Sequence, residues 1–189
     1  MQKGKNARNM ITKVKCLSAF LLILLMVFSC ATVEIQSSED AYEVINSYYR
    51  LDEQNELGKK TVDISQYKEG LDDISVWQNA NTDLGNMNKP EVDFLSLFGE
   101  DEFAGIIREF TEKNPLQLKR NKLKRSIKLK NKAKNLISFP HVFSKNGKKY
   151  ALMYAEVTEG PESGAGGITL FRMDNDGWKD IFYLHLWIS

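Results

Sequence analysis

Apolar residues change their spacing along this 189-residue chain, and the spacing predicts where helices and strands lie. Between residues 40 and 52 they recur every three or four positions, which predicts an amphipathic helix. A second helix is predicted to begin at the acidic residues 100–102 and to end before Pro115. Carboxylates in a first turn interact favourably with the helix dipole, and proline cannot continue a helix. We expect both helices to pack on a core.

The stretch between these helices carries a weaker pattern. Residues 61–64 predict a short strand, and residues 71–77 fit either a helical turn or a second strand. Residues 79–90 contain four asparagines, a glycine and a proline, which predicts a loop.

From residue 137 onward the apolar residues alternate as they do in strands. Candidate strands span residues 137–144, 150–157, 167–173 and 178–188. Asn146-Gly147 and residues 174–177 predict tight turns, and the glycine-rich residues 159–167 predict a loop. Pro140 favours an edge position for the first of these strands.

The last candidate strand is apolar on both faces. One face would carry Trp178, Phe182, Leu184, Leu186 and Ile188, and the other Ile181, Tyr183 and Trp187. Such a strand is predicted to lie in the middle of a sheet. We therefore predict an α+β fold: an antiparallel β-meander of about four or more strands, packed by two or more helices, after an N-terminal signal helix.

The first thirty residues combine a basic stretch with a short apolar run at residues 17–28, followed by Ser29-Cys30. The run is shorter than the ~20 residues that cross a bilayer as a helix. This pattern predicts an export signal. An uncleaved, tilted anchor from Ile11 to Cys30 remains the alternative.

The signal resembles those of bacterial lipoproteins, because Val27 and Ser29 occupy the third and first positions before Cys30. Phe28 between them is bulkier than the usual small residue. The resemblance implies that residues 1–29 are removed, that Cys30 is acylated, and that residues 30–39 tether a single α+β domain at 40–189. It also implies an envelope protein held to the membrane by lipid, in the outer membrane of a Gram-negative cell, since the residue directly after Cys30 is Ala31 and not an acidic residue.

Removing the signal changes both the thiol content and the charge. Cys16 would leave with the signal and Cys30 would be acylated, so redox and thiolate chemistry are excluded. The first 29 residues carry five of the 26 Lys and Arg and none of the 25 Asp and Glu, so the remainder has a formal net charge of −4.

Charge is segregated within that remainder. Residues 30–118 have a net charge of −12, whereas residues 119–134 contain nine basic residues and no acidic one. This basic block consists of Lys119, Arg120, Lys122, Lys124, Arg125, Lys128, Lys130, Lys132 and Lys134. It fits contact with anionic lipid or an envelope protein. Nucleic acid is not an expected partner outside the cytoplasm. A solvated loop or helix face is the simpler interpretation, which the sequence favours.

The search for catalytic and metal-binding motifs is negative. The glycine-rich stretch lacks the Lys-Ser/Thr of a phosphate-binding loop, and Ser163 lacks the glycine of a nucleophile elbow. His141 and His185 show no ligand spacing, although they could meet across the sheet beside Glu156. We expect no catalytic residue, metal or cofactor.

Beyond the lipoprotein signal, residues 147–154, 170–171, 176–179 and 186–189 resemble small uncharacterised lipoproteins of Bacteroidetes. That resemblance implies no activity. The leading hypothesis is a non-catalytic lipoprotein that binds a partner. An envelope hydrolase with a carboxylate or histidine site, and an immunity-type inhibitor, are the alternatives.

Overall fold

The structure is a computed structural model that describes residues 38–49, 55–160 and 163–189. The chain divides into two compact units, Met1–Glu39 and Asp40–Ser189, and nearly all described residues belong to the second.

Several predictions of the sequence fall outside the described residues. These are the signal at 1–29, the acylated Cys30 and most of the tether. Residues 38–48 are helical, in agreement with the predicted helix at 40–52, whose last three residues lie outside the described part.

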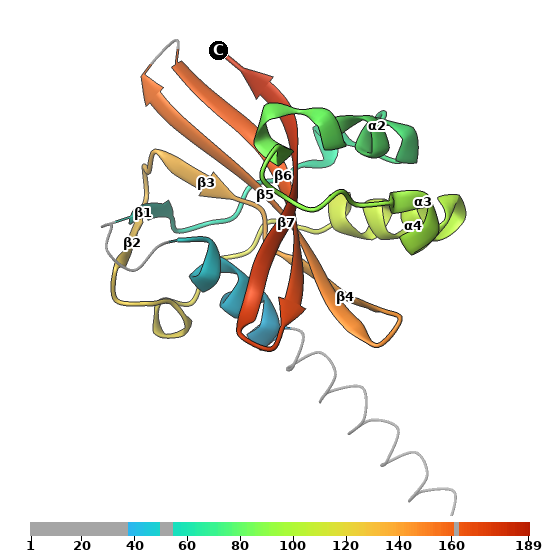
Figure 1. Ribbon diagram of the computed structural model, residues 1–189. Coiled ribbons are helices and arrows are strands. Elements are labelled where there is room, and N and C mark those ends of the chain that lie inside the picture. Colours follow the sequence, from blue (N-terminus) through green and yellow to red (C-terminus); the bar gives the residue numbers. More distant parts are fainter. Residues whose placement is uncertain (1–37, 50–54, 161–162) are drawn as a thin grey trace, which may run out of the picture. The chain divides into compact units, whose positions relative to one another are not determined.

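The second unit has the predicted α+β fold (Figure 1). Its strands are β1 (Asn55–Gly58), β2 (Ile127–Lys130), β3 (Asn135–Ile137), β4 (His141–Lys145), β5 (Lys148–Gly160), β6 (Ser163–Asp174) and β7 (Gly177–Ile188). Its further helices are α2 (Ile74–Asn79), α3 (Phe94–Phe98) and α4 (Glu100–Thr111), with 3₁₀ turns η1 (Ser65–Tyr67), η2 (Ala80–Thr82), η3 (Leu84–Asn86) and η4 (Arg120–Lys122). Strands β4 to β7 pair in chain order and antiparallel, which confirms the meander.

The sheet extends beyond the meander on one side. Its order is β2-β1-β3-β5-β6-β7, and β4 pairs with the same edge of β5 as β3 does. Strand β1 is parallel to both β2 and β3. The predicted central position of β7 is wrong, because β7 is the last strand of this order.

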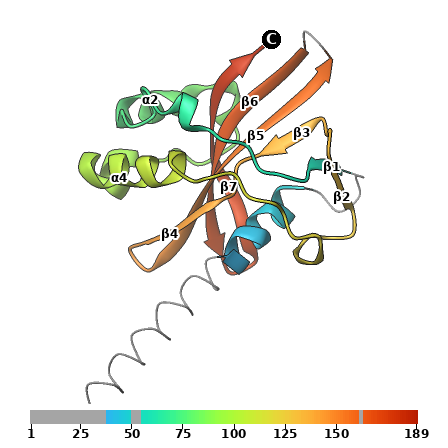
Figure 2. The ribbon, with the colours of Figure 1, turned by 180° about the vertical axis from the view of Figure 1, so that it is seen from behind.

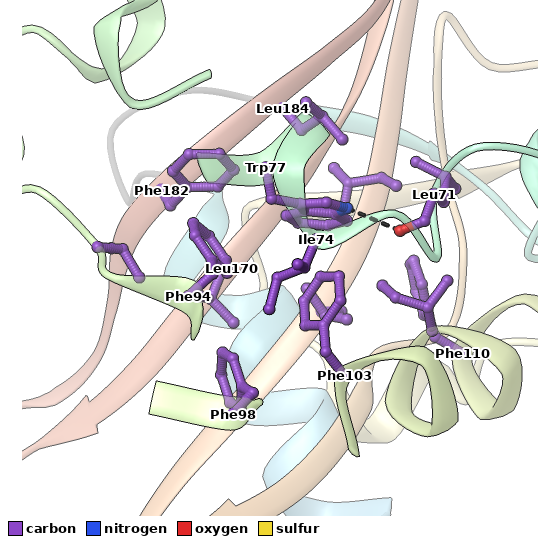
Figure 3. Packing of buried hydrophobic residues seen from close by; sticks show 14 of the residues in the cluster. Leu71, Ile74, Trp77, Phe94, Phe98, Phe103, Phe110, Leu170, Phe182 and Leu184 are labelled. Carbon is purple, nitrogen blue, oxygen red and sulfur yellow. Dashed lines mark hydrogen bonds between the residues drawn. The ribbon is translucent and has the colours of Figure 1, made fainter. Parts of the chain in front are cut away.

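Helices cover both faces of the sheet, and each face has its own core (Figures 1 and 2). On one face, α2, α3 and α4 pack aromatic rings against β5, β6 and β7. Trp77 lies at its centre, fully buried; its indole N–H donates to the carbonyl of Leu71 at 2.8 Å, and its ring stacks on Phe182 (Figure 3). Burying this N–H therefore leaves no donor unsatisfied.

The second core lies on the other face, beneath the first described helix. Tyr42, Val44 and Ile45 of that helix pack with the alternate residues of β5, namely Ala151, Met153 and Ala155. Because successive side chains of a strand point to opposite faces, β5 serves both cores. This alternation explains why β5 is apolar almost throughout its buried length.

The predicted division of β7 into two faces fails at Ile181. The register shifts so that Leu170 pairs with Phe182 while Phe171 pairs with Asp180, and Ile181 is therefore the extra residue of a β-bulge. Ile181 and Phe182 consequently both join the first core. Trp178 belongs to the second core, not to the face of Phe182.

The glycine-rich stretch at 159–167 is not a loop for most of its described length. Residues 163–167 belong to β6, and the described part of β5 reaches Gly160. Three of its glycines, Gly164, Gly166 and Gly167, leave room for aromatic rings. A Cβ on Gly166 would lie 2.3 Å from Trp187 Nε1, and one on Gly167 would lie 2.4 Å from Tyr183 Oη.

The structure corrects two other expectations and decides a third. Residues 61–64 form no strand, and the short strand lies at β1 instead. The single strand predicted at 137–144 is two strands, β3 and β4, because Pro140 has no N–H for the ladder. Residues 71–77 include the start of a helix, α2, which settles the choice that the sequence left open.

The predicted turns are present. Asn146 and Gly147 have φ values of 51° and 73° and join β4 to β5, as their left-handed preference requires. Asn175 and Asp176 form the turn between β6 and β7. Helix α4 ends at Thr111, ahead of Pro115.

Candidate anion-binding surface

The basic block folds as a strand, a 3₁₀ turn and connecting chain at one end of the sheet. Eight of its nine basic residues are exposed, and Lys124 is half-buried. The prediction of a loop or helix face is wrong for residues 127–130, which form the edge strand β2. Lysines on an edge strand also discourage pairing with another chain.

Apolar residues within the block and directly before it hold it against the domain. Leu118, Leu123 and Ile127 are buried in the second core, so the basic residues between them are left at the surface. The first described helix adds polar contacts. Asn46 donates to the carbonyl of Lys122 at 2.9 Å and accepts from the N–H of Lys124 at 2.8 Å.

Arg120 fixes the turn of the block itself. One guanidinium nitrogen, Nη1, donates to the carbonyls of Leu123 at 3.0 Å and Lys124 at 3.1 Å, and Nη2 donates to that of Arg125 at 3.4 Å. A cation thus satisfies three carbonyls that precede β2, which stiffens the chain leading into the strand.

A cavity of about 680 Å³ opens beside the block. Its walls come from three segments of the chain: Lys59; Gln117, Leu118 and Arg120; and Lys128, Leu129 and Lys130. Four of these seven residues are cations, and none is acidic. The cavity therefore offers positive potential in a concave setting, where field lines are concentrated.

The backbone brings these segments together. The N–H of Lys59 donates to the carbonyl of Lys130 at 2.9 Å, and the N–H of Leu118 donates to the carbonyl of Lys59 at 2.9 Å. Lys60 forms an isolated bridge with Gln117. The sequence did not predict that Lys59 belongs to this site. The other residues of the site lie about sixty positions later in the chain.

One carboxylate of the acidic half approaches this region. Glu56 Oε1 lies 3.5 Å from Lys130 Nζ, and both side chains are 49% exposed. An ion pair this exposed contributes ~0–1 kcal/mol and exchanges readily for another partner. Glu56 therefore leaves Lys130 available to an external anion.

The turn at residues 174–177 carries two carboxylates that already have cationic partners. Asp174 pairs with Arg172 at 2.9 Å, and Asp176 pairs with Lys179 at 3.3 Å. The hydrogen bond from Arg172 lowers the pKa of Asp174. These contacts agree with a turn.

The two histidines do not meet. His141 of β4 pairs with Leu152, and His185 of β7 pairs with Gly167, so β5 and β6 lie between them and the separation is at least ~14 Å at ordinary strand spacing. Nor does Glu156 join them: its carboxylate accepts a hydrogen bond from Tyr154 Oη. The suggestion of a shared histidine site is therefore wrong.

His141 instead lies in a buried cluster of its own. Its Nε2 is buried without a hydrogen-bond partner in the described part of the chain, 3.6 Å from Glu109 Oε2. Burial, aided by the charge of Lys113, lowers the pKa of His141 to about 4. Burial also lowers the pKa of Lys113 to about 8, and its Nζ donates to the carbonyl of Pro140 at 3.2 Å. At neutral pH His141 is uncharged and packs face to face with Phe143.

Comparison with known proteins identifies no relative: no protein-family model, curated protein or solved structure matches the chain. Within residues 38–49, 55–160 and 163–189, no helix is long and apolar enough to cross a membrane. In the same residues, no three His, Cys, Asp or Glu side chains come together to hold a metal ion.

Proposed function

We propose that this protein is an envelope lipoprotein, anchored through Cys30, whose α+β domain is a non-catalytic module that binds an anionic surface. The observation that carries the proposal is that Lys59, Arg120, Lys128 and Lys130 all line one cavity, and that none of its wall residues in the described part of the chain is acidic. Basic residues that serve only as a solvated surface are not expected to line one cavity together. We place the protein in the outer membrane of a Gram-negative cell, as the sequence after Cys30 suggests.

Two further features support a binding role. The backbone of the block is held by buried leucines and by Asn46, so the turn and strand that carry the cations need little rearrangement on binding. The remainder of the domain's charge is acidic, which orients the basic surface toward an anionic target and the acidic part away from it.

The proposal is tested with the full chain reconstituted in vesicles of neutral phosphatidylcholine. Such proteoliposomes are expected to capture fluorescent vesicles that contain phosphatidylglycerol. A variant with all nine basic residues of the block changed to Gln is expected to lose most of this capture. Equal capture by the variant and the unchanged protein would reject the basic surface as the contact.

A further inference from the structure

We infer that the surface around Trp187, at one end of the sheet, binds a neutral pyranose ring of a carbohydrate. The indole of Trp187 is the platform on which the sugar stacks, and the carboxylate of Glu156 accepts hydrogen bonds from its hydroxyls. Both side chains are half-buried and therefore in contact with solvent. The ends of β5 and β6 at this surface extend beyond α2, α3 and α4 (Figures 1 and 2). Neither residue belongs to the basic block, so the inference goes beyond the proposed function.

A second β-bulge in β7 gives Trp187 its position. The register of β6 with β7 shifts between Gly166 and Gly167, so Leu186 is an extra residue in β7. Strict alternation along the strand would place Leu186 and Trp187 on opposite faces, as the sequence predicted. With the bulge, Trp187 lies in one row with Gly166 and Glu156 across three strands. Bulges of this kind redirect side chains beside functional sites.

Two glycines of β6 let the indole lie against the backbone. A Cβ on Gly164 would lie 3.1 Å from Cη2 of Trp187, and a Cβ on Gly166 would lie 2.3 Å from its Nε1. The ring system therefore extends along β6 from one glycine to the other. Glycine weakens a strand interior and often marks the close approach of a ligand or of another chain segment. Among the described residues, neither hydrophobic core includes Trp187, so core packing does not account for its placement.

Hydrogen bonds fix the polar edge of the platform. The indole N–H of Trp187 donates to Tyr154 Oη at 2.9 Å, and that hydroxyl donates to Glu156 Oε2. Burial, together with the hydrogen bond to Glu156, raises the pKa of Tyr154, so the hydroxyl keeps its proton at neutral pH. In the described part of the chain no donor reaches Glu156 Oε1, which is therefore available to accept a hydrogen bond from a ligand.

A flat ring beside a carboxylate suits a neutral sugar. A pyranose whose hydroxyls are equatorial has faces of C–H groups, which pack on the electron-rich face of an indole. The hydroxyls at its rim donate to a carboxylate, and hydrogen bonds to a charged acceptor are the stronger ones. An acidic sugar is disfavoured, because Glu156 would repel its charge.

A compact organic cation suits the surface less well. Quaternary ammonium ions are recognised by cages of several aromatic rings. Here Tyr154 is 1% exposed, and the half-buried Tyr67 packs on it with 5.4 Å between the ring centroids. These two rings therefore pack on each other, and within the described residues they form no cage with Trp187.

The tryptophans report on the site directly. The full chain is labelled with fluorotryptophan and placed in nanodiscs of zwitterionic lipid, and fluorine NMR follows its three tryptophans. Trp77 and Trp178 are buried and serve as internal controls, while the resonance lost in Trp187→Phe is that of Trp187. Cellohexaose and chitohexaose are the neutral sugars. Cellohexaose oxidised at its primary hydroxyls to uronic acids is the matched acidic sugar, and tetramethylammonium chloride is the cation.

A neutral hexasaccharide should shift the Trp187 resonance saturably and leave the other two in place. By titration calorimetry, Trp187→Ala should lose about tenfold in affinity, because the stacking surface is removed. Gly166→Ala keeps both binding side chains but displaces the indole, and it should lose about as much. Gly105→Ala, on α4, should bind like the unchanged protein. Glu156→Gln should lose about threefold for cellohexaose and should no longer discriminate against the acidic sugar.

The sugar site is overturned if neither neutral hexasaccharide shifts the Trp187 resonance, or if tetramethylammonium shifts it and the sugars do not. Equal affinities of Gly166→Ala and Gly105→Ala would also overturn it, because the position of the indole would then not matter. Urea unfolding verifies that each variant is folded. Vesicle capture by the basic block is measured separately, so either proposal can fail while the other stands.

Discussion

The side chain of Asn86 forms hydrogen bonds with both backbone polar groups of Tyr183. Asn86 Nδ2 donates to the carbonyl of Tyr183 at 2.8 Å, and the N–H of Tyr183 donates to Asn86 Oδ1 at 2.8 Å. Tyr183 lies on β7, the last strand of the sheet, so one amide side chain occupies the place of a neighbouring strand. An open sheet edge is prone to pair with another chain. The turn η3 therefore closes this edge at its centre.

Asn86→Asp should destabilise the domain by about 2–4 kcal/mol. The carboxylate keeps an acceptor for Tyr183 N–H but loses the Nδ2 donors, which also serve the carbonyl of Ala80. Urea unfolding measures the change, with the exposed Asn88→Asp as the matched control. Equal stability of both variants would show that Asn86 does not hold the edge.

Gly166→Ala should displace the indole of Trp187. The new Cβ would lie 2.3 Å from Trp187 Nε1 and 2.7 Å from Tyr154 Oη, while the indole N–H donates to that hydroxyl at 2.9 Å. We expect a loss of about 1–3 kcal/mol and a shift in tryptophan fluorescence, as strain from overpacking predicts.

Gly105→Ala is the control for that substitution, because a Cβ at Gly105 has no neighbour within 4 Å and the residue lies inside α4. It should stabilise the domain by roughly 0.5–1 kcal/mol, since alanine favours a helix over glycine. If both alanines have the same effect, close contact is not the reason for glycine at position 166.

His141 should make the domain less stable as the pH falls from about 6.5 to 4. Its folded pKa is lowered to about 4 by burial, so the unfolded chain binds more protons in this window. Stability therefore rises with pH there, by ~3 kcal/mol at most if the whole difference is expressed. The carboxylates of Asp63, Asp73 and Asp93 also have lowered pKa values. Their protonation therefore lowers the stability of the domain further at the acid end of this pH range.

His141→Gln isolates the histidine from those carboxylates. Urea unfolding of both proteins at pH 7, 6, 5 and 4 should give a steeper decline for the unchanged protein. Parallel curves would mean that His141 titrates in the folded domain as it does in the unfolded chain.

Cys30→Ala should abolish acylation and leave the precursor unprocessed or released from the membrane. Two or more acyl chains are needed for stable anchoring, and the proposed lipid on Cys30 supplies them. Membrane fractionation and incorporation of a labelled fatty acid measure the effect, and Cys16→Ala should behave normally. Unchanged membrane retention of the Cys30 variant would contradict lipid anchoring.

The meander was predictable because its signals are local. Asn146-Gly147 specifies a hairpin turn, and the alternating residues of β5 specify a strand buried on both faces. Strands β1, β2 and β3 were not predictable, because segments of three or four residues carry too little periodicity and depend on partners far along the chain. The bulge at Ile181 was not predictable either, because an extra residue in a strand is defined by its register with the partner strand β6.

Only part of the candidate site could be predicted from the sequence. The run from Lys119 to Lys134 is evident as a charge block, but its convergence into a cavity requires Lys59, which parallel pairing brings to it. The glycines of residues 159–167 led to a wrong prediction. Gly166 and Gly167 suggested a loop, whereas their lack of a side chain makes room for Trp187 and Tyr183.

The most direct test of the central claim is the salt dependence of vesicle capture. Proteoliposomes of the full chain are titrated with phosphatidylglycerol vesicles at about 20 mM and about 150 mM salt, between which charge screening becomes much stronger. The unchanged protein should capture vesicles at low salt, and this capture should fall steeply at the higher salt concentration. A control with Lys68, Lys148 and Lys179 changed to Gln should behave like it, whereas the nine-residue Gln variant should capture almost none. Capture by the nine-residue variant that equals the unchanged protein at low salt would contradict the account.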